Sequence, residues 1–181
     1  MLDSAETLIT DLSVRRAARK LTGAQRACFV LREGDVCHYA DEDAISPLWK
    51  GMRFPAHTCI SGISMMSGEP VVIEDIFNDE RVPLPAYAPT FVRSLVMVPI
   101  RPDEAIGAIG TYWAWPRIPA HGEVELLQTL ANAASLAIEN ATTQQNLERL
   151  VAERRRRHPA RRRALLVALL LWAIETNGGV A

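Results

Sequence analysis

Short apolar runs bounded by turn residues alternate along this chain with segments of helical periodicity. Residues 3–21 carry apolar side chains at helical spacing and stop before Gly23, which predicts an amphipathic N-terminal helix. Residues 27–31 and 36–40 flank the turn sequence Glu-Gly-Asp at positions 33–35. This arrangement predicts a hairpin of two buried strands.

The centre of the chain alternates between a short helix, buried strands and irregular segments. Residues 59–67 predict a short apolar helix, with Thr58 or Ser61 as its N-cap. Residues 70–75 begin with β-branched side chains and end on two acids, as expected of a strand that leaves the core. The proline-containing segments 41–58 and 76–91 predict irregular structure, the second with one helical turn.

Two more strands and a long helix follow. Residues 94–101 and 105–115 predict strands joined by Pro-Asp-Glu, and the second of them alternates small and large apolar positions. After Pro119 a helix is predicted over residues 121–155, with acidic residues in its first turn. We expect its packing stripe at Leu126, Leu130, Ala133, Ala137 and Ala141.

The order of elements predicts an α+β fold with a central antiparallel sheet of five to six strands. N- and C-terminal helices flank this sheet, and all helices are expected on one side of it. We assign residues 1–150 to this domain and 151–181 to a tail that is basic and then apolar. The apolar run of the tail, residues 164–174, is shorter than the roughly 20 residues that cross a bilayer, so we expect no membrane contact. The sequence leaves open whether residues 156–181 are native, truncated, disordered or an interfacial anchor.

Charge and cysteine content narrow the class of protein. Residues 1–150 carry 13 Lys or Arg and 19 Asp or Glu, so the domain offers no nucleic-acid footprint. The spacing of Cys28, Cys37 and Cys59 fits neither a metal motif nor a disulfide framework, and the four histidines are scattered. The N-terminus carries no signal-peptide pattern. We therefore expect a cytoplasmic protein without a metal site.

Residues 61–99 resemble the centre of a GAF domain, the small-molecule sensor module of signalling proteins. The resemblance rests on a glycine-bracketed helix, the strand "GEPVVIED", the strand "RSLVMVPI" and a following strand that contains glycine. It implies a non-catalytic sensory or regulatory module whose cofactor, if any, is unknown. It also implies a small-molecule ligand, a homodimer formed through the terminal helices, and an output such as a histidine kinase.

The resemblance places a ligand between the sheet and residues 41–91. Nine candidate ligand-binding residues follow from it: Phe54, Cys59, Ile63, Ile73, Asp75, Phe91, Arg93, Val96 and Tyr112. Arg93 is expected to meet Asp75 or an anionic ligand, and capping of the following loop is the alternative role for Asp75. Further aromatic candidates for the lining are Trp49, Tyr87, Trp113 and Trp115.

Two other functions remain as alternatives. Some GAF domains reduce free methionine sulfoxide with a cysteine pair, but the first cysteine position is Ser61 here and residues 76–93 contain none. Cys59 lies two residues too early and is expected to be a small buried side chain. The dipeptide Cys37-His38 falls on a strand rather than on the helix that carries a bilin in related domains. A purely structural dimerisation module is the third reading.

Overall fold

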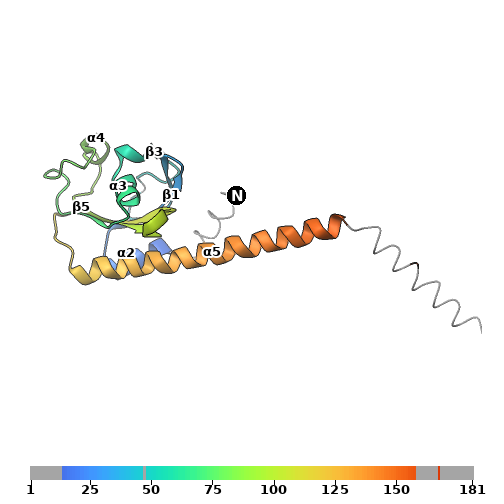
Figure 1. Cartoon of the computed structure of the whole chain (residues 1–181). Helices are drawn as coiled ribbons and strands as arrows, with labels where there is room; N and C mark the ends of the chain where they lie inside the picture. The colour runs from blue at the N-terminus through green and yellow to red at the C-terminus, as the bar shows by residue number, and fades with distance from the viewer. Residues whose placement is uncertain (1–13, 47, 158–166, 168–181) are drawn as a thin grey trace, which may run out of the picture. The chain divides into compact units, whose positions relative to one another are not determined.

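The computed structural model of this chain describes residues 14–46, 48–157 and 167 (Figure 1). Its contacts divide the chain into two compact units that meet in sequence between Glu139 and Asn140. The first unit holds all of the strands, and the described part of the second unit is helical.

The first unit is built on a six-stranded sheet in the order β3-β2-β1-β6-β5-β4. All neighbouring strands run antiparallel, which confirms the predicted α+β fold with an antiparallel sheet. The strands are β1 (Arg26–Glu33), β2 (Val36–Ala44), β3 (Arg53–Pro55), β4 (Val71–Ile73), β5 (Ser94–Ile100) and β6 (Gly107–Trp113). The helices are α2 (Val14–Thr22), η1 (Ala56–Thr58), α3 (Ile60–Ser67), α4 (Leu84–Tyr87), η2 (Pro102–Glu104) and α5 (His121–Arg157).

The first hairpin and the end of the N-terminal helix agree with the sequence prediction. Strands β1 and β2 pair from Glu33 and Val36 outward, and Gly34 has a φ of 63° in the two-residue turn between them. Helix α2 ends before Gly23, whose φ of 64° is favourable for glycine. The predicted start of this helix, in residues 3–13, lies outside the described residues.

Segment 41–58 is more regular than predicted. Strand β2 continues to Ala44, and residues 53–55 pair with it as β3. A three-residue strand is too short to show a period of two, so its pattern gave no signal. The N-cap of α3 is Cys59 and has no side-chain hydrogen bond, so the predicted caps Thr58 and Ser61 are wrong.

The two faces of the sheet carry separate hydrophobic cores, and the helices lie on both of them (Figure 1). Cys28 and Val30 of β1 face the core that contains α3 and the loops around it. Phe29 and Leu31 face the core that contains α2 and α5. The prediction that all helices lie on one side is therefore wrong. The sequence order does not reveal that α3 packs on the opposite face.

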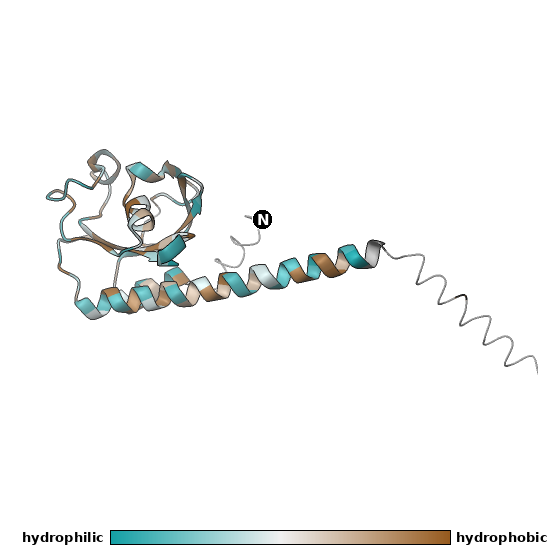
Figure 2. Ribbon diagram, viewed as in Figure 1, coloured by the Kyte–Doolittle hydropathy of each residue, from teal (hydrophilic) through white to brown (hydrophobic). Residues whose placement is uncertain are grey.

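Helix α5 packs on the sheet through a stripe one position away from the predicted one. Its buried apolar residues are Leu127, Ala131, Ala134 and Ile138. The predicted stripe is wrong at its start, where Leu126 is 39% exposed, whereas its member Leu130 is partly buried and packs against this core. Apolar residues stand side by side at several positions of this helix, so spacing alone fits both stripes (Figure 2).

The end of the chain is only partly described. In the second unit, α5 exposes Leu147, Leu150 and Val151. The predicted tail spans residues 151–181. Residues 151–157 of it continue helix α5, whereas residues 158–166 and 168–181 lie outside the described residues. None of the helices that the structure describes has the length and apolarity to cross a membrane.

We expect Gly62→Ala to destabilise the domain because α3 lies directly against η1. A Cβ at position 62 would stand 1.8 Å from the carbonyl oxygen of Ala56, a backbone atom that cannot rotate away. Overpacking of this kind costs about 1–3 kcal/mol or more. Chemical denaturation with urea measures the loss in the free energy of unfolding.

Gly122→Ala is the matched control for this variant. Gly122 lies in the first turn of α5, and a Cβ there meets no atom within 4 Å. Alanine favours a helix over glycine by up to about 1 kcal/mol, so this variant should be neutral or slightly more stable. Equal stabilities of the two variants would show that α3 is not packed as described.

Candidate functional site

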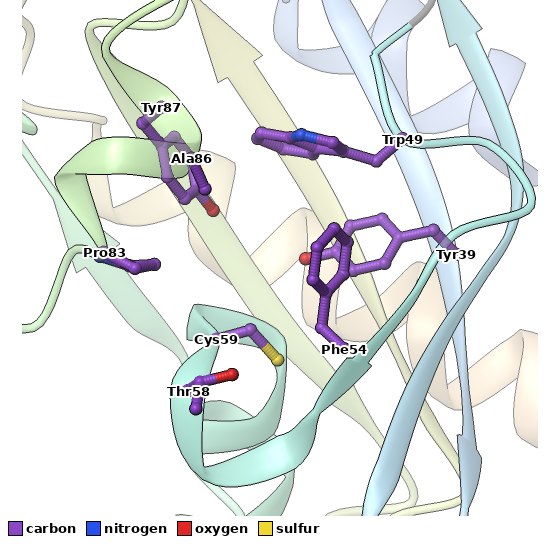
Figure 3. A pocket seen from close by; sticks show the side chains of 8 residues that line it. All are labelled: Tyr39, Trp49, Phe54, Thr58, Cys59, Pro83, Ala86 and Tyr87. Atoms are coloured by element: carbon purple, nitrogen blue, oxygen red, sulfur yellow. The ribbon is translucent and has the colours of Figure 1, made fainter.

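An apolar pocket opens between β2, β3, the start of α3 and the α4 segment (Figure 3). Its volume is about 140 Å³. The lining residues are Tyr39, Trp49, Phe54, Thr58, Cys59, Pro83, Ala86 and Tyr87. The pocket thus lies against residues 41–91, where the sequence analysis placed a ligand.

Aromatic rings in edge-to-face contact form most of the wall. The ring of Tyr39 lies 5.7 Å from that of Trp49 and 5.5 Å from that of Phe54. The rings of Trp49 and Tyr87 are 4.8 Å apart, at an interplanar angle of 65°. Such pairs are favourable at these distances, so the wall is held by its own contacts as well as by the backbone.

A buried ion pair supports Trp49 from behind. The side chain of Arg26 is fully buried, and its Nη2 donates to Oε2 of Glu42 at 2.6 Å. Glu42 also accepts hydrogen bonds from the backbone N–H groups of Leu48 and Trp49. The guanidinium carbon of Arg26 lies 4.5 Å from the Trp49 ring centroid and 4.7 Å from that of Tyr112. This pair therefore fixes the loop that carries the largest aromatic of the pocket.

The chemistry of the lining favours a neutral, apolar ligand. None of the eight lining residues is acidic, basic or a histidine. Burial raises the pKa of both Tyr39 and Tyr87, so these phenols stay neutral at physiological pH. A charged ligand would lose its hydration here without gaining an opposite charge.

The structure brings some of the predicted site residues to the pocket and leaves others beneath it. Phe54 and Cys59 line it. Ile63 and Phe91 are partly buried and pack against the same core. Ile73 is fully buried in that core and does not line the pocket.

Tyr112 lies beneath the wall of the pocket, because its ring packs 5.9 Å from that of Trp49. Val96 belongs to the core on the opposite face of the sheet, under α2 and α5. It cannot line a pocket on this face. Adjacent strand residues point to opposite sides, and the sequence analysis assigned this side wrongly.

Asp75 and Arg93 form the predicted ion pair, at an N–O distance of 3.4 Å. The Arg93 side chain is 40% exposed, so this pair adds little stability. Asp75 also accepts the backbone N–H of Phe77, which is the loop-capping role left as an alternative. Neither residue lines the aromatic pocket.

Two of the lining residues were predicted only as members of a wider aromatic set, and four were not predicted at all. Trp49 and Tyr87 belong to the predicted aromatic set, whereas Trp113 packs on the other face and Trp115 is 49% exposed. Tyr39, Thr58, Pro83 and Ala86 were not predicted. The sequence did contain one indication for Tyr39. It lies two residues after Cys37 on the same strand, so the two side chains point to the same face of the sheet.

Cys37 and Cys59 belong to the same core beside the pocket, which the sequence spacing did not suggest. A hydrogen bond between the two thiols raises the pKa of Cys37. The same bond lowers the pKa of Cys59 to about 6, with help from the Ser61 hydroxyl and the Gly62 N–H. The Cys59 sulfur lies 3.2 Å from the Ser61 oxygen. Cys59 is buried, as expected from the sequence, and its pKa lies below that of an ordinary cysteine.

Comparison with known proteins gives one family. The sequence matches the GAF domain family over residues 8–139. No curated protein matches it. The described residues contain no cluster of three or more His, Cys, Asp or Glu that could hold a metal ion.

Solved GAF domains of signalling proteins share the fold. The blue-light absorbing form of the Thermosynechococcus elongatus PixJ GAF domain has a TM-score of 0.66 at 18% identity, covering 87% of this chain and 96% of that one. The GAF-B domain of DevS from Mycobacterium smegmatis has a TM-score of 0.61 at 17% identity, covering 74% and 93%.

An enzyme structure also shares the fold. The free methionine-R-sulfoxide reductase from Neisseria meningitidis, solved with its substrate, has a TM-score of 0.63 at 20% identity. The match covers 78% of this chain and 87% of that one. The fold is thus common to sensory domains and to enzymes. The fold alone therefore does not distinguish these two functions, and the residues of the pocket are the basis on which we compare them.

We expect Glu42→Gln to destabilise the domain and to release Trp49. Removing one charge of a buried ion pair typically costs about 3–5 kcal/mol, because the other charge stays buried without its partner. Urea denaturation measures the loss, and a red shift of tryptophan emission reports solvent reaching Trp49. Asp43→Asn is the control, since Asp43 pairs with Arg19 where both side chains are about 30% exposed. The control should lose no more than about 1 kcal/mol.

We expect Cys59 to react with iodoacetamide with a midpoint near pH 6, against about 8.5 for a free cysteine. Its lowered pKa means that the thiolate persists as the pH falls from 8 to 6 and is lost below that. Peptide mass spectrometry after timed labelling measures the rate. Ser61→Ala should raise the midpoint by removing one donor. A midpoint near 8.5 in the unaltered protein would contradict the assigned hydrogen bonds.

Proposed function

Since the chain belongs to the GAF domain family, we propose that it is a non-catalytic sensory or regulatory module that binds a small molecule in the aromatic pocket. The observation that carries this proposal is the pocket itself, with four aromatic rings and no acidic, basic or histidine side chain in its lining. Pockets that combine apolar walls with a few polar groups are the usual sites of small ligands.

The size of the pocket sets the size of the ligand. An apolar cavity of roughly 150 Å³ binds benzene, and this pocket has about 140 Å³. We therefore infer a neutral ligand of about one ring. The Thr58 hydroxyl and the Cys59 sulfur, which also line the pocket, offer it a hydrogen bond. A linear tetrapyrrole has four rings and exceeds this volume.

The sheet connects the pocket to helix α5, because strand β1 contributes side chains to the cores on both faces. Strand β1 places Cys28 and Val30 in the pocket-side core, and it places Phe29 and Leu31 in the core that holds Leu127 of α5. A ligand that favours one position of this strand would bias the helix on its other face. The output that the helix controls is a partner such as a histidine kinase.

We place dimerisation on the terminal helices. In the second unit, Leu147, Leu150 and Val151 of α5 are each at least half exposed and recur at helical spacing. This pattern suits the seam of a coiled coil with a second copy of the chain. The cytoplasm is the compartment that we propose, because all three cysteines are free thiols.

A free methionine sulfoxide reductase is the second candidate. The presence of Cys37 and Cys59 in one core beside the pocket favours it, because a reductase of this kind needs two thiols. The pocket lining argues against it. Free methionine sulfoxide carries an ammonium and a carboxylate group, and none of the eight lining residues has the positive charge that would pair with the carboxylate. A reductase assay with and without Cys59→Ser separates the two candidates.

We expect a neutral aromatic probe to bind the protein at least about tenfold more tightly than its anionic analogue, because the pocket lining has no cationic side chain. Ligand-observed NMR compares benzyl alcohol with benzoate. Ala86→Phe should abolish binding because it fills the pocket. Ala88→Phe is the matched control, since Ala88 is exposed on the same turn and is not part of the lining.

Native mass spectrometry of protein purified from cells completes this test. A bound mass that is lost on denaturation and is absent from Ala86→Phe would identify the ligand. Equal binding of the two probes, or binding unaffected by Ala86→Phe, would contradict the proposed site. A protein that binds no probe and carries no bound mass would favour the purely structural dimerisation module.

A further inference from the structure

Three buried tyrosines belong to the core around the pocket, and one of them differs from the other two in its hydrogen bonding. The Tyr39 hydroxyl lies 3.2 Å from the Ser61 oxygen, and the Tyr112 hydroxyl lies 3.2 Å from the Cys28 sulfur. Tyr87 is only 2% exposed, yet its hydroxyl has no hydrogen-bond partner among the described residues. Nearly all buried polar groups in proteins are hydrogen-bonded, so this hydroxyl calls for a partner.

The Tyr87 hydroxyl points into the pocket. Tyr87 ends helix α4 and lines the pocket, and its oxygen is directed into the space that the other lining side chains surround (Figure 3). Its ring packs against Trp49, with 4.8 Å between the ring centroids. Its backbone carbonyl oxygen accepts hydrogen bonds from the N–H and the hydroxyl of Thr90, at 2.8 and 2.7 Å. The hydroxyl is therefore held in place, and the group that pairs with it has to come from the pocket.

The other hydroxyls of the lining leave the role of donor to Tyr87. The Thr58 hydroxyl donates to the backbone carbonyl oxygen of Pro55 at 2.8 Å, so it can offer a ligand only its lone pairs. The Tyr39 hydroxyl already lies within hydrogen-bond distance of Ser61. Burial raises the pKa of Tyr87, so this phenol keeps its proton. Among the described hydroxyls of the lining, that of Tyr87 is thus the one free to donate to a ligand.

We propose that Tyr87 determines the specificity of the pocket, and that the ligand is a neutral one-ring compound whose carbonyl oxygen accepts the hydrogen bond of the Tyr87 hydroxyl. This inference rests on the proposed ligand-binding function and names the chemical class of the ligand. A carboxylate is also an acceptor, but the lining has no cationic side chain to balance its charge. A hydrocarbon of the same shape leaves the buried hydroxyl unpaired, so the pocket disfavours it.

The test compares acetophenone with α-methylstyrene, in which a CH₂ group replaces the carbonyl oxygen. Ligand-observed NMR measures the dissociation constants of both probes for the full-length protein, and their ratio gives the preference for acetophenone. Tyr87→Phe should lower this preference at least about fivefold, as expected for one lost hydrogen bond in a buried site. An unchanged preference in Tyr87→Phe would overturn the proposal.

Tyr112→Phe is the matched control for this variant. It removes the same atom from a buried tyrosine, but the Tyr112 hydroxyl lies against Cys28, and Tyr112 is not part of the pocket lining. The control should therefore keep the preference of the unaltered protein. A loss of preference in Tyr112→Phe as large as that in Tyr87→Phe would contradict the specific role of Tyr87.

Infrared difference spectroscopy with acetophenone that carries carbon-13 at its carbonyl group tests the hydrogen bond directly. Accepting a hydrogen bond weakens the C=O bond and lowers its stretching frequency. The frequency of the bound probe should therefore be higher in Tyr87→Phe than in the unaltered protein, and it should be unchanged in Tyr112→Phe. Equal frequencies in the unaltered protein and in Tyr87→Phe would overturn the proposal even where the affinity changes.

Urea denaturation without a probe tests the bonding state of the hydroxyl. Tyr87→Phe should keep or raise the urea midpoint, because it removes no hydrogen bond to a described residue. Tyr112→Phe should lower the midpoint, because it removes the contact with Cys28. A midpoint that falls as far in Tyr87→Phe as in Tyr112→Phe would show that the Tyr87 hydroxyl is already paired, and would overturn the proposal.

Failure of this inference and failure of the proposed function give different results. If neither probe binds the unaltered protein, the proposed ligand site is wrong, and the role of Tyr87 in it is wrong as well. If both probes bind with a preference that Tyr87→Phe does not change, the ligand site stands and only the role of Tyr87 is wrong.

Discussion

The buried ion pair between Arg26 and Glu42 is the constraint on which the pocket depends. A fully buried guanidinium is costly unless its charge is met, and Glu42 meets it at 2.6 Å. The remaining capacity of Glu42 is used by the backbone N–H groups of Leu48 and Trp49. One carboxylate therefore neutralises the core cation and also fixes the loop between β2 and β3. Without the Glu42 carboxylate, no hydrogen bond from it would hold the Trp49 backbone beside Arg26. The aromatic wall of the pocket would then lose the Trp49 ring.

The same pair explains why the pocket is apolar although a cation lies behind it. The flat faces of Trp49 and Tyr112 cover the guanidinium at 4.5 and 4.7 Å, where cation–π attraction is effective. The Arg26 charge thus meets aromatic rings rather than the ligand space. Two hydrogen-bonding atoms of Arg26, Nε and Nη1, have no partner among the described residues.

Most of the fold could be predicted from the sequence, because its elements are indicated by short local patterns of residues. The hairpin turn at Gly34, the paired strands β5 and β6, and the long helix α5 each follow from turn chemistry or periodicity. The packing stripe of α5 could not be selected, because neighbouring apolar residues fit two stripes equally well. The side of the sheet that α3 covers depends on contacts between distant residues, which a single sequence does not encode in any short pattern.

The candidate site was harder to predict than the fold for the same physical reason. Phe54 and Cys59 were identified because the family resemblance pointed to them, but Val96 was assigned to the wrong face of β5. Cys37 and Cys59 lie 22 positions apart in the sequence, and only the pairing of β2 with β3 and the position of α3 place both in one core. The burial of the Arg26–Glu42 pair could not be predicted from the sequence either, since a charged residue in a strand usually faces solvent.

The two-faced sheet described above also has a consequence for how this protein can change over generations. Alternate residues of β1 and β6 belong to two different cores. A substitution at Cys28 or Val30 therefore changes side-chain contacts on the pocket side, and one at Phe29 or Leu31 changes them on the helix side. Mutation can alter the packing behind the pocket while the side chains that pack against α5 stay the same. The two faces of one short strand can in this way evolve separately.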